Sequence, residues 1–210
     1  MSLEVRWLGR ISYSDALHLQ ETLVAERGTP AGESGKPDVL LLLEHEPVYT
    51  IGRTKDQSSL RDVSALPHPV VQINRGGQAT YHGPGQLVGY PILDLRKRGQ
   101  DLHRYLRELE EGLIEGLAHF GIQGIRREGL TGVWVENRKI ASIGVGVRRW
   151  ISMHGFALNV CGDLTPFTAI TPCGIAGVEM TSIEREAGCA VDVKTAADVI
   201  GAAMVKRFAA

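Results

Sequence analysis

The spacing of apolar residues along the chain predicts three helices. Residues 101–120 carry leucine and aromatic side chains every three or four positions, the repeat of an amphipathic helix, and Gly121 follows as a stop. Residues 12–27 show a shorter repeat between serines that can cap a first turn and Gly28. Residues 194–208 predict a short third helix. We interpret the leucine stripe of residues 101–120 as core packing rather than as part of a site.

Short apolar or alternating runs predict strands. These runs are residues 3–8, 38–44, 47–51, 70–74, 86–93 and 150–160, and residues 133–136 and 139–147, joined at Asn137-Arg138, predict a β-hairpin. Because many strands follow one another directly, the order favours an α/β fold of the α+β type over a doubly wound parallel sheet. In such a fold a mixed, mostly antiparallel sheet is flanked by helices. The polar stretch 29–37 indicates a loop rather than a linker, so we expect one domain over residues 1–210.

Composition and charge exclude several classes of protein. Lysine and arginine number 23 against 24 aspartates and glutamates, so the net charge of -1 favours neither nucleic acid nor a membrane surface as a partner. The longest apolar run, residues 39–43, is far too short to cross a bilayer, and the first residues lack the pattern of a signal peptide. Three cysteines without a C-x-x-C pair argue against a disulfide framework or a cysteine-ligated metal. We therefore expect a cytoplasmic protein without a metal.

Residues 75–91 are the most unusual stretch of the sequence. They hold five glycines and two prolines together with Arg75, Tyr81 and His82. An ordinary strand does not contain so many β-breaking residues, and a disordered linker does not carry these aromatic and apolar side chains. Glycine lets a ligand approach the backbone closely, so we interpret the stretch as an ordered loop that holds a ligand. The residues alone do not identify that ligand.

Three further segments combine polar and small residues. Lys139 opens a strand of small and apolar residues, His154 interrupts an apolar strand, and Cys173 stands between a proline and a glycine. A cysteine on such a rigid turn can direct its sulfur into a cleft and act as a nucleophile, but most free cysteines are small buried residues. Both interpretations of Cys173 are open at this point. A lone lysine is usually solvated and a lone histidine in a strand usually belongs to the core, so neither identifies a chemistry by itself.

Taken together, these segments resemble one family, the octanoyl-acyl-carrier-protein–protein octanoyltransferases (lipoyl/octanoyl transferases) of lipoate biosynthesis. The matching motifs are Arg75-Gly76-Gly77-Gln78 with Thr80-Tyr81-His82-Gly83-Pro84-Gly85-Gln86-Leu87, then Lys139-Ile140-Ala141-Ser142-Ile143-Gly144, His154-Gly155-Phe156-Ala157-Leu158-Asn159 and Pro172-Cys173-Gly174-Ile175. They occur in the order of the family. The resemblance implies the fold of the biotin/lipoate protein ligase catalytic domain, which agrees with the strand pattern.

The resemblance also implies roles for individual residues. Cys173 is then the nucleophile that carries the acyl group as a thioester, and Lys139 is its catalytic partner. The acyl pocket is implied for Arg75, Gly76, Gly77, Gln78, Ala79, Thr80, Tyr81, His82, Ser142, Ile143, Gly144, Gly155, Phe156 and Ala157. The backbone N–H of Gly174, next to the cysteine, is expected to stabilise the oxyanion. A phosphate-binding loop usually leads into a helix, whereas residues 75–91 lead into a strand, which favours an acyl-chain wall over a nucleotide site.

The implied donor is octanoyl-acyl carrier protein, and the implied acceptors are lipoyl domains of 2-oxoacid dehydrogenase complexes and the glycine cleavage H protein. No cofactor is expected, since exchange between thioesters is near energetic balance and formation of the amide is downhill. Two alternatives stay open: an ATP-dependent lipoate–protein ligase on the same fold, and a non-catalytic module that binds acyl chains or carrier protein. A ligase activates a free acid and needs no nucleophilic cysteine, so the Pro-Cys-Gly turn favours the transferase.

Overall fold

The computed structural model describes residues 2–28 and 36–209. Most of the loop predicted for residues 29–37 lies outside the described residues. The helices of the described residues are α1 (Tyr13–Arg27), α2 (Leu102–Ala118), α3 (Ile183–Ala187) and α4 (Val193–Phe208). The predictions of α1, α2 and α4 are confirmed to within two residues at each end. The side chains of Ser12, Asp101 and Asp192 accept hydrogen bonds from the first turns of these three helices, which explains where they begin.

The larger of two sheets has eight strands. Its strands are β1 (Leu3–Ile11), β2 (Asp38–His45), β6 (Gln86–Ile92), β7 (Ile125–Arg127), β8 (Leu130–Val135), β9 (Arg138–Arg148), β10 (Ile151–Asn159) and β11 (Glu179–Met180). The spatial order is β1-β2-β6-β10-β9-β8-β7, with β11 beside β9. Only the β1–β2 and β9–β11 pairs are parallel. The prediction of a mixed, mostly antiparallel sheet flanked by helices is therefore confirmed.

A smaller sheet of three strands carries part of the glycine-rich stretch. It consists of β3 (Val48–Ile51), β4 (Val70–Gln72) and β5 (Thr80–His82), with β3 in the middle. The sequence predicted a loop where β5 lies. In the structure β5 pairs antiparallel with β3, so residues 80–82 are held in extended conformation. The strands β5, β7 and β11 have only two or three residues, too few for a recognisable alternation.

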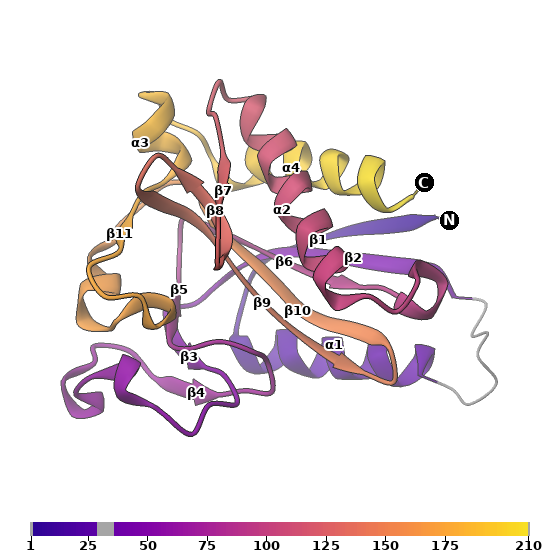
Figure 1. Cartoon of the computed structure of the whole chain (residues 1–210), viewed down its shortest axis with the longest axis horizontal. Helices are drawn as coiled ribbons and strands as arrows, with labels where there is room; N and C mark the ends of the chain where they lie inside the picture. The colour runs from indigo at the N-terminus through magenta and orange to yellow at the C-terminus, as the bar shows by residue number, and fades with distance from the viewer. Residues whose placement is uncertain (1, 29–35, 210) are drawn as a thin grey trace.

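Helices cover both faces of the large sheet, as Figure 1 shows: α1 lies on one face, and α2 and α4 lie on the other. The central strand β2 contributes side chains to the hydrophobic cores on both faces of the sheet. Leu40 and Leu42 belong to the core beneath α2 and α4, whereas Val39, Leu41 and Leu43 belong to the core beneath α1. A strand buried on both faces reads as a continuous apolar run, which is the pattern of residues 39–43. Among the residues described, no helix has the length and apolar character needed to span a membrane.

One edge of the large sheet is built from two different segments. Strand β8 pairs with β9 only as far as Ala141. Further along β9, the N–H of Gly76 donates to the carbonyl of Val145 at 3.0 Å, so the glycine-rich stretch takes over the edge. Residues 142–144 lie between these two partners. The gap between β8 and the glycine-rich stretch is where the candidate site opens.

Candidate active site

A cavity of about 360 Å³ lies at this gap, within the size range of small-ligand sites. Of the predicted site residues, those lining it are Arg75, Gly76, Gly77, Gln78, Thr80, His82, Lys139, Ser142, Ile143, Gly144, Gly155, Phe156, Ala157 and Cys173. The structure thus brings four motifs, spread over about a hundred residues of chain, to one cavity. The lining residues that sequence reasoning did not assign are Tyr13, Ile73, Tyr90, Leu106, Gly129, Leu130, Thr131, Val145, His154 and Ile175.

Two predicted pocket residues lie outside the cavity wall. Ala79 is fully buried, and its carbonyl accepts the N–H of Cys173 at 2.8 Å, so its backbone fixes the cysteine. Tyr81 points away from the cavity into a cluster with Tyr49 and Phe167. Successive side chains of a strand face opposite sides, and β5 directs Thr80 and His82 towards the cavity, so Tyr81 points the other way.

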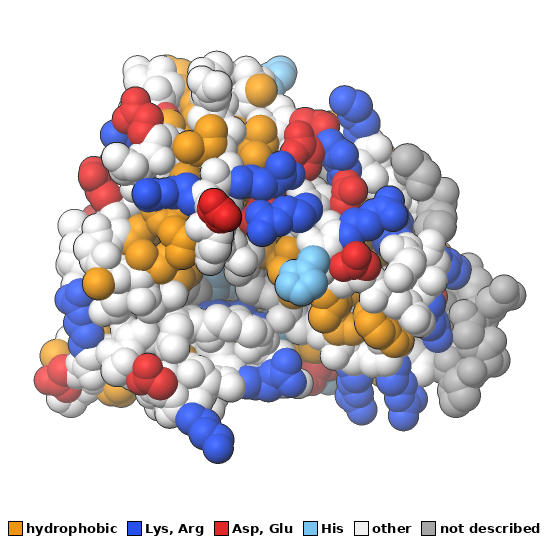
Figure 2. All heavy atoms as spheres, in the orientation of Figure 1, with side chains coloured by type: hydrophobic (Ala, Val, Ile, Leu, Met, Phe, Trp, Pro, Cys, Tyr) orange, Lys and Arg blue, Asp and Glu red, His pale blue; other side chains and the backbone are white. Residues whose placement is uncertain are grey.

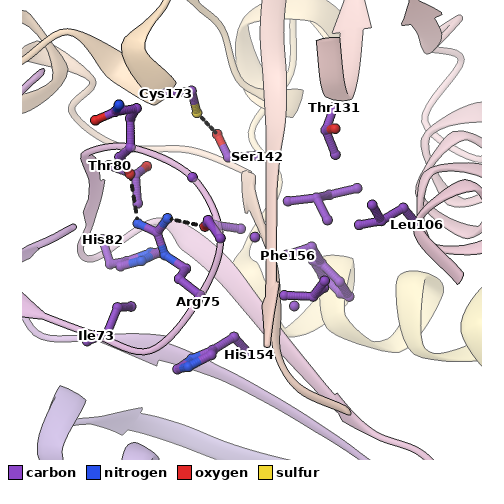
Figure 3. Close-up of a pocket in the computed structure, with 18 of the residues that line it drawn as sticks. Ile73, Arg75, Thr80, His82, Leu106, Thr131, Ser142, His154, Phe156 and Cys173 are labelled. Atoms are coloured by element: carbon purple, nitrogen blue, oxygen red, sulfur yellow. Dashed lines mark hydrogen bonds between the residues drawn. The ribbon is translucent and has the colours of Figure 1, made fainter. Parts of the chain in front are cut away.

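Cys173 sits on the predicted turn in an unusual backbone conformation. Its φ of 55° lies in the left-handed region, which residues other than glycine seldom adopt. The Sγ atom is 3.6 Å from the hydroxyl oxygen of Ser142 and forms a hydrogen bond with it, as Figure 3 shows. The N–H of Gly174 donates to the carbonyl of Thr171 at 2.9 Å. This N–H is therefore occupied, and the expectation that it serves the oxyanion is wrong for this conformation.

Lys139 lines the same cavity but contacts other groups. Its Nζ donates to the carbonyl of Thr131 at 3.0 Å and lies 5.2 Å from the centre of the Trp134 ring, a cation–π distance. The side chain is only 1% exposed. Within the described chain, no hydrogen bond joins Lys139 to Cys173, and no carboxylate pairs with the ammonium. The sulfur and the ammonium thus share a cavity, and the residue in contact with the sulfur is Ser142.

Arg75 is a second buried cation at this cavity. Its guanidinium donates to the carbonyls of Gly76 and Gln78 and to the hydroxyl of Thr50, at 2.9, 3.1 and 3.0 Å. Among the residues described, no carboxylate pairs with it. Burial lowers the pKa of Arg75, and the charge of Cys173 acts in the opposite direction. The arginine therefore ties the glycine-rich stretch together, and its charge interacts with Cys173.

His82 lies in the middle of a buried row of hydrogen bonds that starts at Arg75. Its Nε2 lies 3.3 Å from the hydroxyl of Thr50, and its Nδ1 lies 2.8 Å from Oε1 of Gln86. Because the amide oxygen of Gln86 only accepts, Nδ1 carries the proton and Nε2 accepts from Thr50. Burial, together with the neighbouring His45, lowers the pKa of His82 to about 3. The ring is therefore neutral at neutral pH.

The same row continues to the strand of Lys139. The side-chain nitrogen of Gln86 donates to Asn159 at 3.0 Å, and Asn159 donates to the carbonyl of Thr181 at 2.9 Å. The N–H of Thr181 then donates to the carbonyl of Lys139 at 3.0 Å. Buried polar groups are costly unless they are paired, and here each member has its partner. The row connects the glycine-rich stretch with the start of β9, so His82 contributes to the framework of the site.

His154 is the other histidine at the cavity. It is 2% exposed and has a left-handed φ of 56°, and neither ring nitrogen has a hydrogen-bond partner among the described residues. Burial, with the charge of Arg75 nearby, lowers the pKa of His154 to about 4. It presents a neutral, unpartnered ring to the floor of the cavity.

Ser59 links the two loops that meet at the site. Its hydroxyl accepts the N–H of Ala79 at 3.1 Å and donates to the side chain of Gln78 at 2.9 Å, while its carbonyl accepts the N–H of Thr171 at 2.7 Å. One buried serine therefore holds the glycine-rich stretch and the cysteine turn together. It lies in a stretch whose polar sequence, Asp56-Gln57-Ser58-Ser59, gave no signal of such a role.

The face around the cavity is hollowed near its centre and bordered by basic side chains, as Figure 2 shows. Part of this charge is compensated, since Arg107 and Arg126 pair with glutamates of α2. A second groove shares Arg75, Gly76, Gly77 and Gln78 with the cavity and extends to Arg53. Arg53 forms no ion pair within the described residues. In those residues, no cluster of histidine, cysteine, aspartate and glutamate is arranged to hold a metal ion.

Comparisons with known proteins agree with this geometry. The sequence model of the lipoyl protein ligase A/B catalytic domain matches residues 12–205. An octanoyltransferase from Geobacter sulfurreducens is 55% identical over 195 residues, which cover 93% of this chain and 80% of that protein. The fold is similar to that of a bipartite lipoate protein ligase from Thermoplasma acidophilum, with a TM-score of 0.70 at 16% identity over 99% of this chain and 84% of that one. It is also similar to lipoate-protein ligase A bound with ATP, with a TM-score of 0.66 at 15% identity over 100% and 85% of the two chains. This chain belongs to the family of lipoyl protein ligase A/B catalytic domains.

Proposed function

We propose that this chain is an octanoyltransferase of protein lipoylation, whose catalytic domain spans residues 1–210. It moves an octanoyl group from acyl carrier protein to a lysine of a lipoyl domain, with Cys173 as the covalent carrier. The observation that carries the proposal is a cysteine held on a strained turn in the wall of the cavity, in a chain 55% identical to an octanoyltransferase. Lipoyl domains of 2-oxoacid dehydrogenase complexes and the glycine cleavage H protein are the proposed acceptors.

In the first step, the thiolate of Cys173 attacks the carbonyl carbon of the donor thioester. A new carbon–sulfur bond forms, the bond to the carrier thiol breaks, and the carrier leaves as a thiolate that takes up a proton. A free thiol has a pKa of about 8.5 and is mostly protonated at neutral pH. The buried guanidinium of Arg75 interacts with Cys173. Ser142 donates a hydrogen bond to the sulfur in this state.

In the second step, the acceptor amine attacks the thioester on Cys173. An amide bond forms and the Cys173 thiolate leaves. A free lysine with a pKa near 10.4 is only about 1 part in 2,500 neutral at pH 7, so a group that removes its proton accelerates this step. The Lys139 ammonium is proposed to attract the thiolate during the first step, and its neutral form is the proposed base here, which returns the proton to the leaving sulfur. Its position in the cavity wall supports this role.

The octanoyl tail is proposed to lie between the glycine-rich stretch and β9–β10. Burying about seven carbons, at roughly 0.8 kcal/mol each, contributes about 5 kcal/mol of binding free energy. Phe156, Ile143 and Leu130 supply apolar surface on one side of the cavity, and glycines supply bare backbone on the other. The groove that extends to Arg53 shares residues 75–78 with the cavity and is the proposed approach for the thioester arm of the carrier.

Intact-mass measurement after incubation with octanoyl-acyl carrier protein tests the proposal. We expect one octanoyl adduct on the wild-type chain and none on Cys173→Ala, because the thioester forms only at that sulfur. Cys189→Ala is the matched control, since Cys189 is exposed and outside the cavity, and it should keep the adduct. Lys139→Ala should abolish transfer to a lipoyl domain while the protein remains folded.

The same assay distinguishes an octanoyltransferase from an ATP-dependent ligase. An ATP-dependent ligase would lipoylate the domain from free octanoate and ATP and would not require Cys173. Transfer that proceeds from the carrier thioester without ATP supports the transferase. An adduct that persists in Cys173→Ala would remove the nucleophile from this proposal.

A further inference from the structure

The ammonium of Lys139 is held by the backbone of β8. It donates to the carbonyl of Thr131, and its side chain passes directly over Gly132. A Cβ atom on Gly132 would lie 2.5 Å from the carbonyl oxygen of Ala141 and 2.8 Å from Cε of Lys139, and the φ of Gly132 is +126°. Glycine is required here both for space and for conformation. The position of the lysine therefore depends on this stretch of β8.

The same peptide group is held from its other side by Glu110 of α2. The N–H of Gly132 belongs to the peptide whose carbonyl is that of Thr131. It donates to Oε1 of Glu110 at 3.0 Å. Because the C=O and N–H of a trans peptide point in opposite directions, Lys139 and Glu110 lie at opposite edges of one peptide plane. The pairing of β8 with β9 shifts register next to this point, and the N–H of Gly132 is satisfied by the carboxylate.

Glu110 is itself held firmly. It is completely buried, and its second oxygen accepts hydrogen bonds from Arg107 at 2.5 Å and from Arg126 at 3.0 Å. A buried carboxylate with both oxygens occupied has few alternative positions, and the paired arginines offset the cost of its charge. Its place on a long helix that packs on the sheet adds rigidity.

We propose that Glu110 is a positioning residue for Lys139, acting through the Thr131–Gly132 peptide. The carboxylate fixes the orientation of the peptide plane, and the charge on its oxygen polarises the peptide so that the Thr131 carbonyl becomes a stronger acceptor for the ammonium. These linked contacts, from the carboxylate through the peptide to the ammonium, thus determine the position of Lys139 in the cavity. This inference rests on the proposed catalytic role of Lys139.

Kinetics of octanoyl transfer give the first test. Glu110→Leu keeps a similar volume but removes the acceptor, so the peptide and the lysine lose their support. We expect kcat to fall by about 10- to 100-fold, with KM for the acyl donor within about twofold, because only the catalytic group is displaced. Glu110→Gln keeps an oxygen for the Gly132 N–H and should stay within about threefold of wild type. Glu111→Leu is the control: Glu111 pairs with Arg126 but does not touch Gly132.

A second readout is independent of octanoyl transfer. The alkylation rate of Cys173 by iodoacetamide, followed by peptide mass, should fall in Lys139→Ala because a nearby cation is lost. Glu110→Leu should lower it similarly, and the double variant Glu110→Leu/Lys139→Ala should show no further fall, since Glu110 acts through the lysine. If Glu110→Leu does not fold, Glu110→Asp takes its place, because the shorter side chain keeps the charge but withdraws its oxygen from the Gly132 N–H.

The outcomes separate the two proposals. If Lys139→Ala leaves both transfer and alkylation unchanged, the role of Lys139 is wrong and the positioning role is overturned with it. If Lys139→Ala lowers both but Glu110→Leu or Glu110→Asp behaves as wild type, only the positioning role is wrong. An additive further loss in the double variant would show that Glu110 acts on stability and not through Lys139.

Discussion

Cys173 shows how a single residue can be prepared for chemistry by its backbone. A non-glycine residue in the left-handed region carries a strain of order 1–3 kcal/mol, which persists only where the surroundings hold it. Here its N–H is bonded to Ala79, and the next N–H is bonded to Thr171. The proline and glycine on either side predicted a rigid turn, and the structure contains one. The contact of the sulfur with Ser142 had no sequence signal, because the two residues are 31 positions apart.

Replacing Ser142 tests that contact. Ser142→Ala removes the hydroxyl that lies 3.6 Å from Sγ, so the thiolate loses a donor. We expect the acylation rate of Cys173 to fall by about three- to tenfold, the effect of one ordinary hydrogen bond of about 0.5–1.5 kcal/mol. Single-turnover measurement of the octanoyl adduct by intact mass gives this rate directly. Ser142→Thr, which keeps a hydroxyl, should recover most of it, and an unchanged rate in Ser142→Ala would rule out a role for the hydroxyl.

At the scale of elements, the pairing of β6 with β10 sets one wall of the cavity. Gly89 of β6 lies opposite Phe156 of β10, and the Phe156 ring occupies the space above the glycine. A Cβ atom on Gly89 would lie 2.1 Å from the tip of this ring. The absence of a side chain at position 89 therefore determines how far Phe156 stays out of the cavity that it lines.

Gly89→Ala is expected to shift the preference of the enzyme towards shorter acyl chains. The added methyl group pushes the Phe156 ring into the cavity, so octanoyl no longer fits while hexanoyl does. A mismatch of about one or two methylenes should lower kcat/KM for octanoyl by about 10- to 200-fold relative to hexanoyl. Kinetics with the two acyl carrier thioesters measure the ratio, and thermal unfolding checks the fold. Equal losses for both chains would indicate a general packing defect instead.

Elements with a long repeat could be predicted from the sequence, and short ones could not. The stripe of α2 was interpreted as core, and Tyr105, Leu109, Leu113 and Leu117 are buried there. Leu106 of the same stripe lines the cavity instead. The strands β5 and β11 pair with strands far away in the chain, and β7 pairs with the neighbouring β8 but has only three residues, so no local pattern reports them.

At the scale of the whole molecule, three buried histidines make folding stability depend on pH. Burial lowers the pKa of His45 and His154 to about 4 and, with the neighbouring His45, that of His82 to about 3. In the unfolded chain the same groups take up protons below about pH 6.5. Between these pH values the unfolded state binds more protons than the folded state. The contribution of the histidines to the free energy of unfolding is therefore largest above about pH 6.5 and decreases as the pH falls towards 4 and 3.

We expect the free energy of unfolding to drop by about 2–4 kcal/mol between pH 7.5 and 5.5, since each histidine contributes up to about 1.4 kcal/mol per pH unit. Urea unfolding at a series of pH values measures it. His45→Gln should reduce the slope, because it removes one of the three buried rings. A flat profile over this range would contradict the neutral state of the buried rings.

The site combines residues that stand out in the sequence with residues that do not. Residues within the motifs were found because polar and glycine residues stand out in apolar strands. Tyr13, Ser59 and Glu110 were missed because each lies in an ordinary stretch and acquires its role only through a partner at least nineteen positions away in the chain, such as Gln78 or Gly132. A single sequence gives the type of each residue and its local pattern, but contacts between distant residues follow from the topology of the fold.

The cavity is lined at one extreme by Tyr13 and at the other by Ile175, so its walls draw on nearly the whole length of the chain. During synthesis on the ribosome, no acyl-binding site can exist until residue 175 has emerged and the turn of Cys173 has met the glycine-rich stretch. Contacts between such distant residues form slowly in folding because long loops must close first. If Cys173 carries the acyl group as proposed, return of the octanoyl adduct after refolding therefore measures complete assembly of the fold.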